Sequence, residues 1–402
     1  MLPHAYEGLT LLPWLILTLT LPLMLLRRTR LSAFQPPSQD EAPMVSIIVP
    51  ARDEAVNIST CVASLLNTEY PRYEIIVVDD GSVDGTGDIV RILSDHTDER
   101  LQLITGEPLP DGWLGKPWAC WQGAQRARGE LLLFTDADTR HEEALLGHAV
   151  GAMQKQGADL VSVFPRQLMV GFWERLILPH IFAILTLRYS DLDRVNRTRR
   201  PRNVIANGQF ILVSREAYDS VGGHEALRAE VVEDQRLAQR LVADGRTIFI
   251  GHAQKLMDTR MYRSLGGIVE GWSKNLALGS RQAAPAWAGP MVPWFIAAFL
   301  ICVWVVPQIV LLLALTTPLG GDWQTWSLTV TALCVVFWTM VMLSMRVPAL
   351  FSITFPFGAA VAAALFVRSA LRGTHVEWKG RHYDVAAVSD LAGPAPDPAH
   401  GP

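Results

Sequence analysis

The uneven distribution of charged residues is the strongest constraint on how this chain can fold. Between Ala286 and Val367 the only charged residues are Asp322 and Arg346. These two residues divide the stretch into three apolar runs, at roughly 288–315, 323–345 and 347–367. Each run is long enough to cross a bilayer, which takes about 20 residues as a helix. Three such runs in succession favour membrane spans over buried helices of a soluble protein.

A further apolar run lies near the N-terminus, from Leu9 to Leu26, and Arg27, Arg28 and Arg30 follow it. A cleaved signal peptide would carry its positive charges before the apolar run and a small-residue cleavage site after it. Here the positive charges come after the run. The sequence therefore predicts a signal anchor with its N-terminus outside and Arg27 in the cytoplasm, where arginine is retained.

The C-terminal end presents a problem of parity. Arg281 precedes the apolar runs, and four further basic residues follow them: Arg368, Arg372, Lys379 and Arg381. The positive-inside rule places both ends in the cytoplasm, which requires an even number of crossings. The sequence leaves two or three C-terminal spans open, and Pro348 and Pro356 make the last run the weakest candidate. We expect a multi-pass protein of the inner (plasma) membrane with its soluble part in the cytoplasm.

The middle of the chain has an ordinary charge density and alternates short β-branched runs with amphipathic helices. We expect strands at Val45–Pro50, Glu74–Asp79, Leu101–Ile104 and Leu131–Thr135, and helices at Ile58–Leu66 and from a cap at Asp84 to Leu93. Apolar strands separated by helices are typical of a mostly parallel α/β sheet that is covered on both faces. The predicted organisation is an anchor and linker at 1–43, a soluble α/β domain at 44–280, and a transmembrane region with a short tail at 281–402.

Acidic residues follow three of the predicted strands. They are Asp53 and Glu54, Asp79 and Asp80, and Asp136 and Asp138. Ligands of such sheets bind at the carboxyl ends of the strands, so these acids should share one site. Crowded carboxylates call for a cation, and oxygen ligands suit Mg²⁺ or Mn²⁺. The residues thus predict a metal-dependent nucleotide or nucleotide-sugar enzyme beside a membrane. The net charge of −4 argues against a nucleic-acid partner.

Four motifs in order resemble the family 2 glycosyltransferases of the GT-A fold. They are VSIIVPARDEA (45–55), YEIIVVDDGSVDGT (73–86), GWLGKPWACWQGAQRARGELLLFTDAD (112–138) and VVEDQRLA (231–238). The resemblance covers about 44–280. Within the family, the stretches MYRS…GWSKN (261–275) and VEWKGRHY (376–383) resemble membrane-attached bacterial enzymes that glycosylate carotenoid, hopanoid or other lipid acceptors.

The resemblance implies roles for individual residues. On the donor side, Pro50, Ala51 and Glu54 would line the nucleotide pocket, Asp80 would bind the base, and Lys116 would lie near the diphosphate. Asp136 and Asp138 would form the DxD element, with Asp138 as the direct metal ligand. Asp234 of the Glu233-Asp234 pair would be the general base. It also implies a hexosyltransferase-type reaction with a UDP-sugar donor, Mg²⁺ or Mn²⁺, a lipid or polyprenoid acceptor, and inversion by single displacement.

One departure concerns the acceptor side of the site. Processive polysaccharide synthases of the family carry QxxRW after the acidic pair, and this chain has Gly271-Trp272-Ser273-Lys274-Asn275 in that region. Trp272 is predicted to stack on the acceptor and Lys274 to steady the diphosphate. Transfer of one sugar per acceptor is therefore favoured over chain synthesis. A membrane-bound nucleotidyltransferase and a processive synthase stay open as alternatives.

Overall fold

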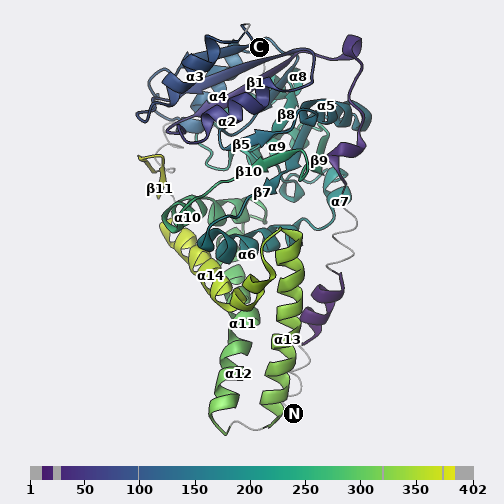
Figure 1. Cartoon of the computed structure of the whole chain (residues 1–402), viewed down its shortest axis with the longest axis vertical. Coiled ribbons are helices and arrows are strands. Elements are labelled where there is room, and N and C mark those ends of the chain that lie inside the picture. Colours follow the sequence, from purple (N-terminus) through teal and green to yellow (C-terminus); the bar gives the residue numbers. More distant parts are fainter. Residues whose placement is uncertain (1–10, 21–28, 98, 319–320, 374, 385–402) are drawn as a thin grey trace. The chain divides into compact units, whose positions relative to one another are not determined.

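The computed structural model describes residues 11–20, 29–97, 99–318, 321–373 and 375–384 (Figure 1). Arg27 and Arg28, which set the predicted orientation of the anchor, lie outside these residues, as does much of the run from Leu9 to Leu26. The described part of that run is a short apolar helix at Leu11–Thr20.

The chain forms two compact units, and each is assembled from separate stretches. The sheet unit consists of Thr29–Leu168, Leu192–Met261 and Thr374–Pro402, and the helical unit of Met1–Arg28, Met169–Asp191 and Tyr262–Gly373. These units do not coincide with the predicted stretches 1–43, 44–280 and 281–402. The difference arises because the compact units are defined by packing between segments that are distant in sequence. Charge density along the chain does not predict such packing.

A seven-stranded sheet forms the centre of the sheet unit, in the order β3-β2-β1-β4-β8-β6-β9. The strands are β1 (Val45–Ala51), β2 (Tyr73–Asp79), β3 (Leu101–Thr105), β4 (Leu131–Phe134), β6 (Leu160–Phe164), β8 (Ile211–Ser214) and β9 (Ile248–His252). Only β8 runs antiparallel to its neighbours β4 and β6 within this sheet. The predicted mostly parallel α/β class is confirmed, and the four predicted strands occur within a residue of their expected bounds.

Helices cover the sheet, and a small second sheet lies beside it (Figure 1). The helices are α2 (Ile58–Leu66), α3 (Thr86–Ser94), α4 (Gly115–Arg126), α5 (Leu145–Gln156), α7 (Leu192–Asn196), α8 (Arg215–Ser220) and α9 (Glu233–Ala243). The second sheet has the order β5-β10-β7, from β5 (Thr139–His141), β10 (Met257–Thr259) and β7 (Arg166–Gln167). The N-cap of α3 is Gly85 and not the predicted Asp84. Asp84 lies one residue before the cap, and its carboxylate accepts the Thr86 N–H.

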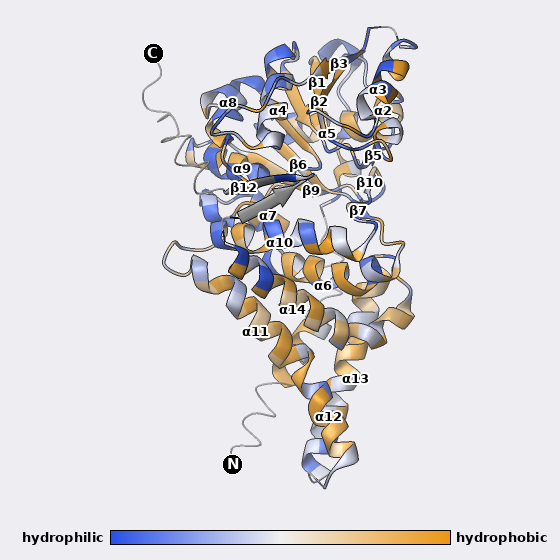
Figure 2. Ribbon diagram, turned by 90° about the vertical axis from the view of Figure 1, so that its left-hand side faces the viewer, coloured by the Kyte–Doolittle hydropathy of each residue, from blue (hydrophilic) through white to orange (hydrophobic). Residues whose placement is uncertain are grey.

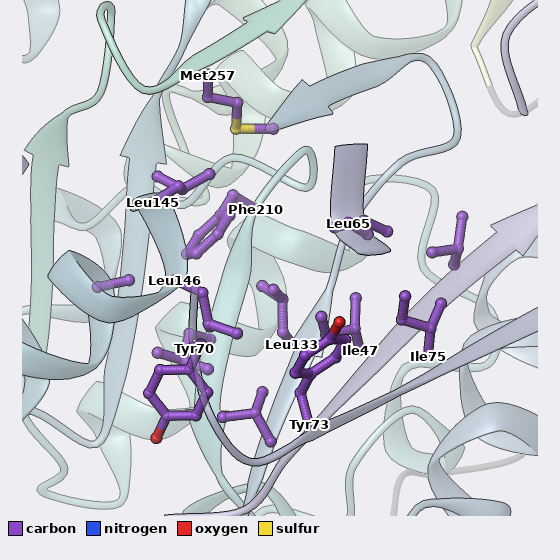
Figure 3. Packing of buried hydrophobic residues seen from close by; sticks show 14 of the residues in the cluster. Ile47, Leu65, Tyr70, Tyr73, Ile75, Leu133, Leu145, Leu146, Phe210 and Met257 are labelled. Atoms are coloured by element: carbon purple, nitrogen blue, oxygen red, sulfur yellow. The ribbon is translucent and has the colours of Figure 1, made fainter. Parts of the chain in front are cut away.

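The core of the sheet unit is built from apolar side chains of adjacent strands (Figure 3). Ile47, Ile75 and Leu133 come from β1, β2 and β4, and each is at most 1% exposed. Phe210, fully buried, joins them just before β8. Burial of each such side chain contributes about 1.5–3 kcal/mol. This packing fixes the strands, and therefore fixes the loops that leave their carboxyl ends.

The helical unit contains α6 (Phe172–Arg188), α10 (Leu265–Gln282), α11 (Val292–Trp304), α12 (Val306–Thr316), α13 (Gly321–Ser344) and α14 (Phe355–Arg372). Three helices in the described residues are long and apolar enough to cross a membrane: Gly289–Thr316, Gly321–Ser344 and Ala349–Arg372. Figure 2 shows their largely hydrophobic ribbons. Large apolar side chains such as Leu312 (63% exposed) and Phe357 (72% exposed) point outward. Exposed apolar surface of this kind is typical of contact with lipid.

Candidate active site

The carboxyl ends of three neighbouring strands bring the predicted acids to one edge of the sheet. Ala51 at the end of β1 pairs with Asp79 at the end of β2, and β4 lies on the other side of β1. Asp80 follows β2 directly, and Asp136 follows β4 after one residue. The expectation that acids from three strands meet at one edge is confirmed within the sheet unit.

Asp53 joins two loops at this edge. Its N–H donates to Ser82 Oγ (3.0 Å), and its carboxylate accepts the Val83 N–H (2.9 Å). The next residue, Glu54, donates its N–H to Thr86 Oγ1 (2.8 Å). Asp53 has a φ of 51°, which is in the left-handed region that aspartate tolerates better than most residues. Its carboxylate therefore shapes the loop.

Asp138 has the character of a cation ligand. Its Oδ1 is buried and accepts no hydrogen bond from any residue that the structure describes. Burial raises the pKa of Asp138 to about 7, and the nearby charges of Asp136 and Glu54 act in the same direction. An unpaired buried carboxylate is costly unless a cation compensates it. Oxygen ligands of this kind fit Mg²⁺ or Mn²⁺.

A complete metal cage is not present in the described part of the chain. No group of three or more His, Cys, Asp or Glu side chains there is arranged to hold an ion. Mg²⁺ typically keeps waters and binds through one or two carboxylates together with substrate phosphates. Asp136 and Asp138 fit that arrangement, in which part of the coordination comes from a diphosphate.

Lys116 connects the two acidic motifs of the site. Its Nζ lies 2.8 Å from Asp136 Oδ1 and 2.8 Å from Glu233 Oε1. Burial lowers the pKa of Lys116, but the two carboxylates more than offset this, so that the pKa lies above its usual range. The ammonium is therefore a fixed positive charge between the DxD element and the Glu233-Asp234 pair.

Asp234 is held by the backbone at the start of α9. Its Oδ2 accepts the Gly208 N–H (2.7 Å) and its Oδ1 accepts the Gln235 N–H (2.7 Å). A Cβ at position 208 would lie 3.0 Å from Lys116 Nζ and 3.1 Å from Asp234 Oδ2, so this close approach favours glycine. Gly208 was not predicted from the sequence, because a single glycine in a loop carries no local signal.

The tail of the chain also contributes to this site, which the sequence analysis did not foresee. Lys379 Nζ lies 2.8 Å from Glu54 Oε1, and an Arg381 guanidinium nitrogen lies 2.6 Å from Asp80 Oδ2. Both residues belong to a hairpin of the sheet unit, β11 (His375–Trp378) and β12 (Arg381–Asp384). The signal available in the sequence was Gly380, because two-residue hairpin turns favour glycine at their second position.

The predicted site residues fall into two sets. Nine of them lie in the sheet unit: Pro50, Ala51, Glu54, Asp80, Lys116, Asp136, Asp138, Glu233 and Asp234. Trp272 and Lys274 lie on α10 of the helical unit. Trp272 is 8% exposed and packs against Phe182 and Tyr262, with ring centroids 5.9 Å and 6.3 Å away. These contacts give Trp272 a packing role, and the roles predicted for Trp272 and Lys274 toward the acceptor and diphosphate stay predictions.

The sheet unit has a GT-A-like α/β fold. Residues 46–222 match the sequence profile of Glycosyl transferase family 2, so this part of the chain is a family 2 glycosyltransferase domain. The mannosyltransferase PcManGT from Pyrobaculum calidifontis, solved in complex with GDP-Man and Mn²⁺, has a similar fold. It superposes with a TM-score of 0.54 at 19% identity, over 92% of this chain and 95% of that protein.

Two relatives are similar in sequence. The 4,4'-diaponeurosporenoate glycosyltransferase of Staphylococcus haemolyticus is 25% identical over 297 residues, which cover 73% of this chain and 75% of the relative. The enzyme of the same name from Staphylococcus aureus (strain MRSA252) is 28% identical over 257 residues, which cover 62% of this chain and 65% of the relative. The resemblance to carotenoid-type lipid glycosyltransferases is thus confirmed.

Proposed function

We propose that this protein transfers one sugar from a nucleotide-diphosphate donor, a UDP-sugar, to a hydroxyl oxygen of a carotenoid-type or other polyprenoid lipid. The observation that carries the proposal is the arrangement around Lys116, which joins the DxD acid Asp136 to the acidic pair at Glu233. The names of the Staphylococcus relatives support the lipid acceptor.

In the proposed reaction Asp234 acts as the general base. Its carboxylate removes the proton of the acceptor group as that oxygen attacks the anomeric carbon of the donor. The bond between the anomeric carbon and the diphosphate oxygen breaks in the same step, so the configuration inverts and the nucleoside diphosphate leaves. Lys116 holds Glu233 and keeps positive charge beside the diphosphate. A divalent ion held by Asp138 and Asp136 would neutralise charge on the leaving diphosphate.

The experiment that tests this function uses the detergent-purified full chain. We expect release of a nucleoside diphosphate when it is incubated with Mn²⁺, native lipid extract and one member of a panel of nucleotide sugars. Mass spectrometry of the lipids should show one added sugar per acceptor. Release of pyrophosphate from nucleoside triphosphates would indicate a nucleotidyltransferase instead, and a ladder of added sugars would indicate a processive synthase.

The tail hairpin supports an even number of C-terminal crossings. Residues 375–384 belong to the same compact unit as the stretch that ends at Met261, although the three apolar helices separate them in sequence. Both ends of the helical region must then lie on one side of the membrane. We propose that Gly289–Thr316 and Gly321–Ser344 cross and that Ala349–Arg372 does not.

The packing of the third helix supports that choice. Of its most apolar stretch 44% is buried in the protein, against 39% for Gly321–Ser344 and 22% for Gly289–Thr316. Its α14 part packs against α11 of the first candidate span, and also against α6 and α10, which are not candidate spans. The proposed location is therefore the plasma membrane, with the sheet unit and the tail in the cytoplasm, where nucleotide sugars are made.

Cysteine labelling in intact cells tests this topology. In a Cys302→Ala background we introduce Val83→Cys, at a position that is 89% exposed in the sheet unit. We expect a membrane-impermeant maleimide to label Val83→Cys, and likewise Ser389→Cys in the tail, only after lysis. His4→Cys, on the side predicted to be outside, is the positive control for intact cells. Labelling of Ser389→Cys alone in intact cells would overturn the even number of crossings, and labelling of Val83→Cys would overturn the cytoplasmic site.

The proposed base also predicts a pH dependence. Burial, together with the charge of Glu233, raises the pKa of Asp234 to about 6, and the positive charge of Lys116 works against this rise. Because the base acts in its ionised form, kcat/KM should fall about tenfold per pH unit below that pKa. Lys116→Met removes the opposing charge, so its acid limb should move to higher pH. Lys155→Met, an exposed lysine on α5, is the matched control, and an acid limb that stays in place in both variants would argue against Asp234.

A further inference from the structure

The C-terminal hairpin of the sheet unit has a tight, specific turn. In β11 and β12, Trp378 pairs with Arg381, so that Lys379 and Gly380 alone form the loop. Their φ angles are 49° and 75°. Two positive φ angles are the signature of a type I′ turn, which matches the twist of a two-residue hairpin. Gly380 adopts this conformation freely, whereas Lys379 does so at a cost. Residues held in such costly conformations cluster at active sites and in segments that clamp a ligand.

The turn is anchored on the donor side of the predicted active site. Lys379 Nζ donates to the Asp53 carbonyl oxygen (3.0 Å) as well as pairing with Glu54. Arg52 Nε donates to the Lys379 carbonyl oxygen (3.3 Å). Arg381 pairs with Asp80, whose carboxylate is 2% exposed. The hairpin therefore contacts the loops after both β1 and β2, on the residues expected to bind the nucleotide.

The charge balance of the site indicates what these cations are for. The loops after β1, β2 and β4 and the start of α9 all contribute acids to the candidate site, and Lys116 is already shared between Asp136 and Glu233. A nucleoside diphosphate adds further negative charge. Even with one divalent ion, such a ligand needs more cations near its phosphates. Lys379 pairs with Glu54, and its positive charge also acts on the Asp138 carboxylate.

We propose that Lys379 and Arg381 are donor-binding residues, and that the hairpin turn exchanges its carboxylate partners for the nucleoside diphosphate when the donor binds. This inference rests on the proposed function, because it takes the pocket at Glu54 and Asp80 as the nucleotide site. It extends that site to a segment that is distant in sequence: Arg381 and Asp80 are 301 positions apart. The sheet-unit loops and the tail then close on the same ligand.

Nucleotide binding to the full chain in detergent tests the proposal, with UDP, GDP and dTDP as probes and Mn²⁺ present. Each of Lys379→Ala and Arg381→Ala should weaken binding of the preferred nucleotide by about tenfold, and the double variant by about 100-fold, as expected for lost charge-assisted hydrogen bonds. Lys379→Arg should retain most of the affinity. Lys155→Ala removes an exposed lysine far along the chain on α5 and should have no effect.

A backbone variant separates the geometry of the turn from its charge. No atom lies within 4 Å of a Cβ placed on Gly380, so Gly380→Ala adds no clash there. It disfavours the positive φ instead and should weaken nucleotide binding while both cations are kept. The melting temperature without nucleotide shows whether the variant is folded.

The outcomes distinguish this inference from the proposed function. If the wild type binds no nucleoside diphosphate, the proposed function fails and the inference fails with it. If the wild type binds but Lys379→Ala and Arg381→Ala bind equally well, the inference alone is wrong. Tighter binding by the two variants would also overturn it, because the hairpin would then be a plug that competes with the donor.

Discussion

Asp138→Ala is expected to abolish sugar transfer without destabilising the protein. The proposed metal contributes several kcal/mol to the reaction, so its loss should lower turnover by about 10³-fold or more. The same substitution removes a buried carboxylate oxygen that has no hydrogen-bond partner among the described residues. Since an unpaired buried charge is costly, the free energy of unfolding in metal-free buffer should be unchanged or higher.

This pairing of lost activity with kept or gained stability separates a ligand from a structural residue. Turnover is measured with saturating donor over a range of Mn²⁺ concentrations, and stability by thermal unfolding in EDTA. Asp88→Ala is the matched control, because Asp88 is an exposed acid on α3 whose side chain pairs with Arg91. A well-folded Asp138→Ala protein with near wild-type turnover in EDTA would show that the metal interpretation is wrong.

The sheet and its acids were predictable because their signals are local. Continuous β-branched runs such as VSIIVP and EIIVVD predict parallel strands, and parallel strands deliver their following residues to one edge. The same reasoning could rank Asp136 and Asp138 as ligands. It could not show that Asp53 joins two loops through hydrogen bonds to Ser82 and Val83, because these bonds depend on the turn that the second loop makes.

The rest of the site depends on contacts that no local pattern records. Gly208 approaches Asp234 from a loop before β8, and the hairpin around Lys379 returns to the sheet unit after the whole helical region. The parity of membrane crossings was open for the same reason. Charge counts left two or three spans, and the return of the tail to the unit of Glu54 supports an even number.

Asp234→Asn is expected to lower turnover by about 10²–10⁴, the usual contribution of a general base. The substitution keeps the shape of the side chain and removes its basicity. Because both carboxylate oxygens accept backbone N–H groups, the new amide must face either Gly208 or Gln235 with a donor. That mismatch costs about 1–3 kcal/mol of stability, so turnover is compared at a temperature well below the unfolding transition.

Donor binding is the control that isolates the chemical step. Asp234→Asn should bind the preferred nucleoside diphosphate about as tightly as the wild type, since Lys116, Asp136 and Asp138 are unchanged. Glu233→Gln is the paired variant. It removes the charge of Glu233 from its ion pair with Lys116, in which Oε1 and Nζ lie 2.8 Å apart. Glu233→Gln should therefore affect donor binding more than Asp234→Asn does. If Asp234→Asn keeps its turnover while Glu233→Gln loses it with donor binding intact, the base is Glu233, and the hydrogen bonds from Gly208 and Gln235 give Asp234 a structural role at the start of α9.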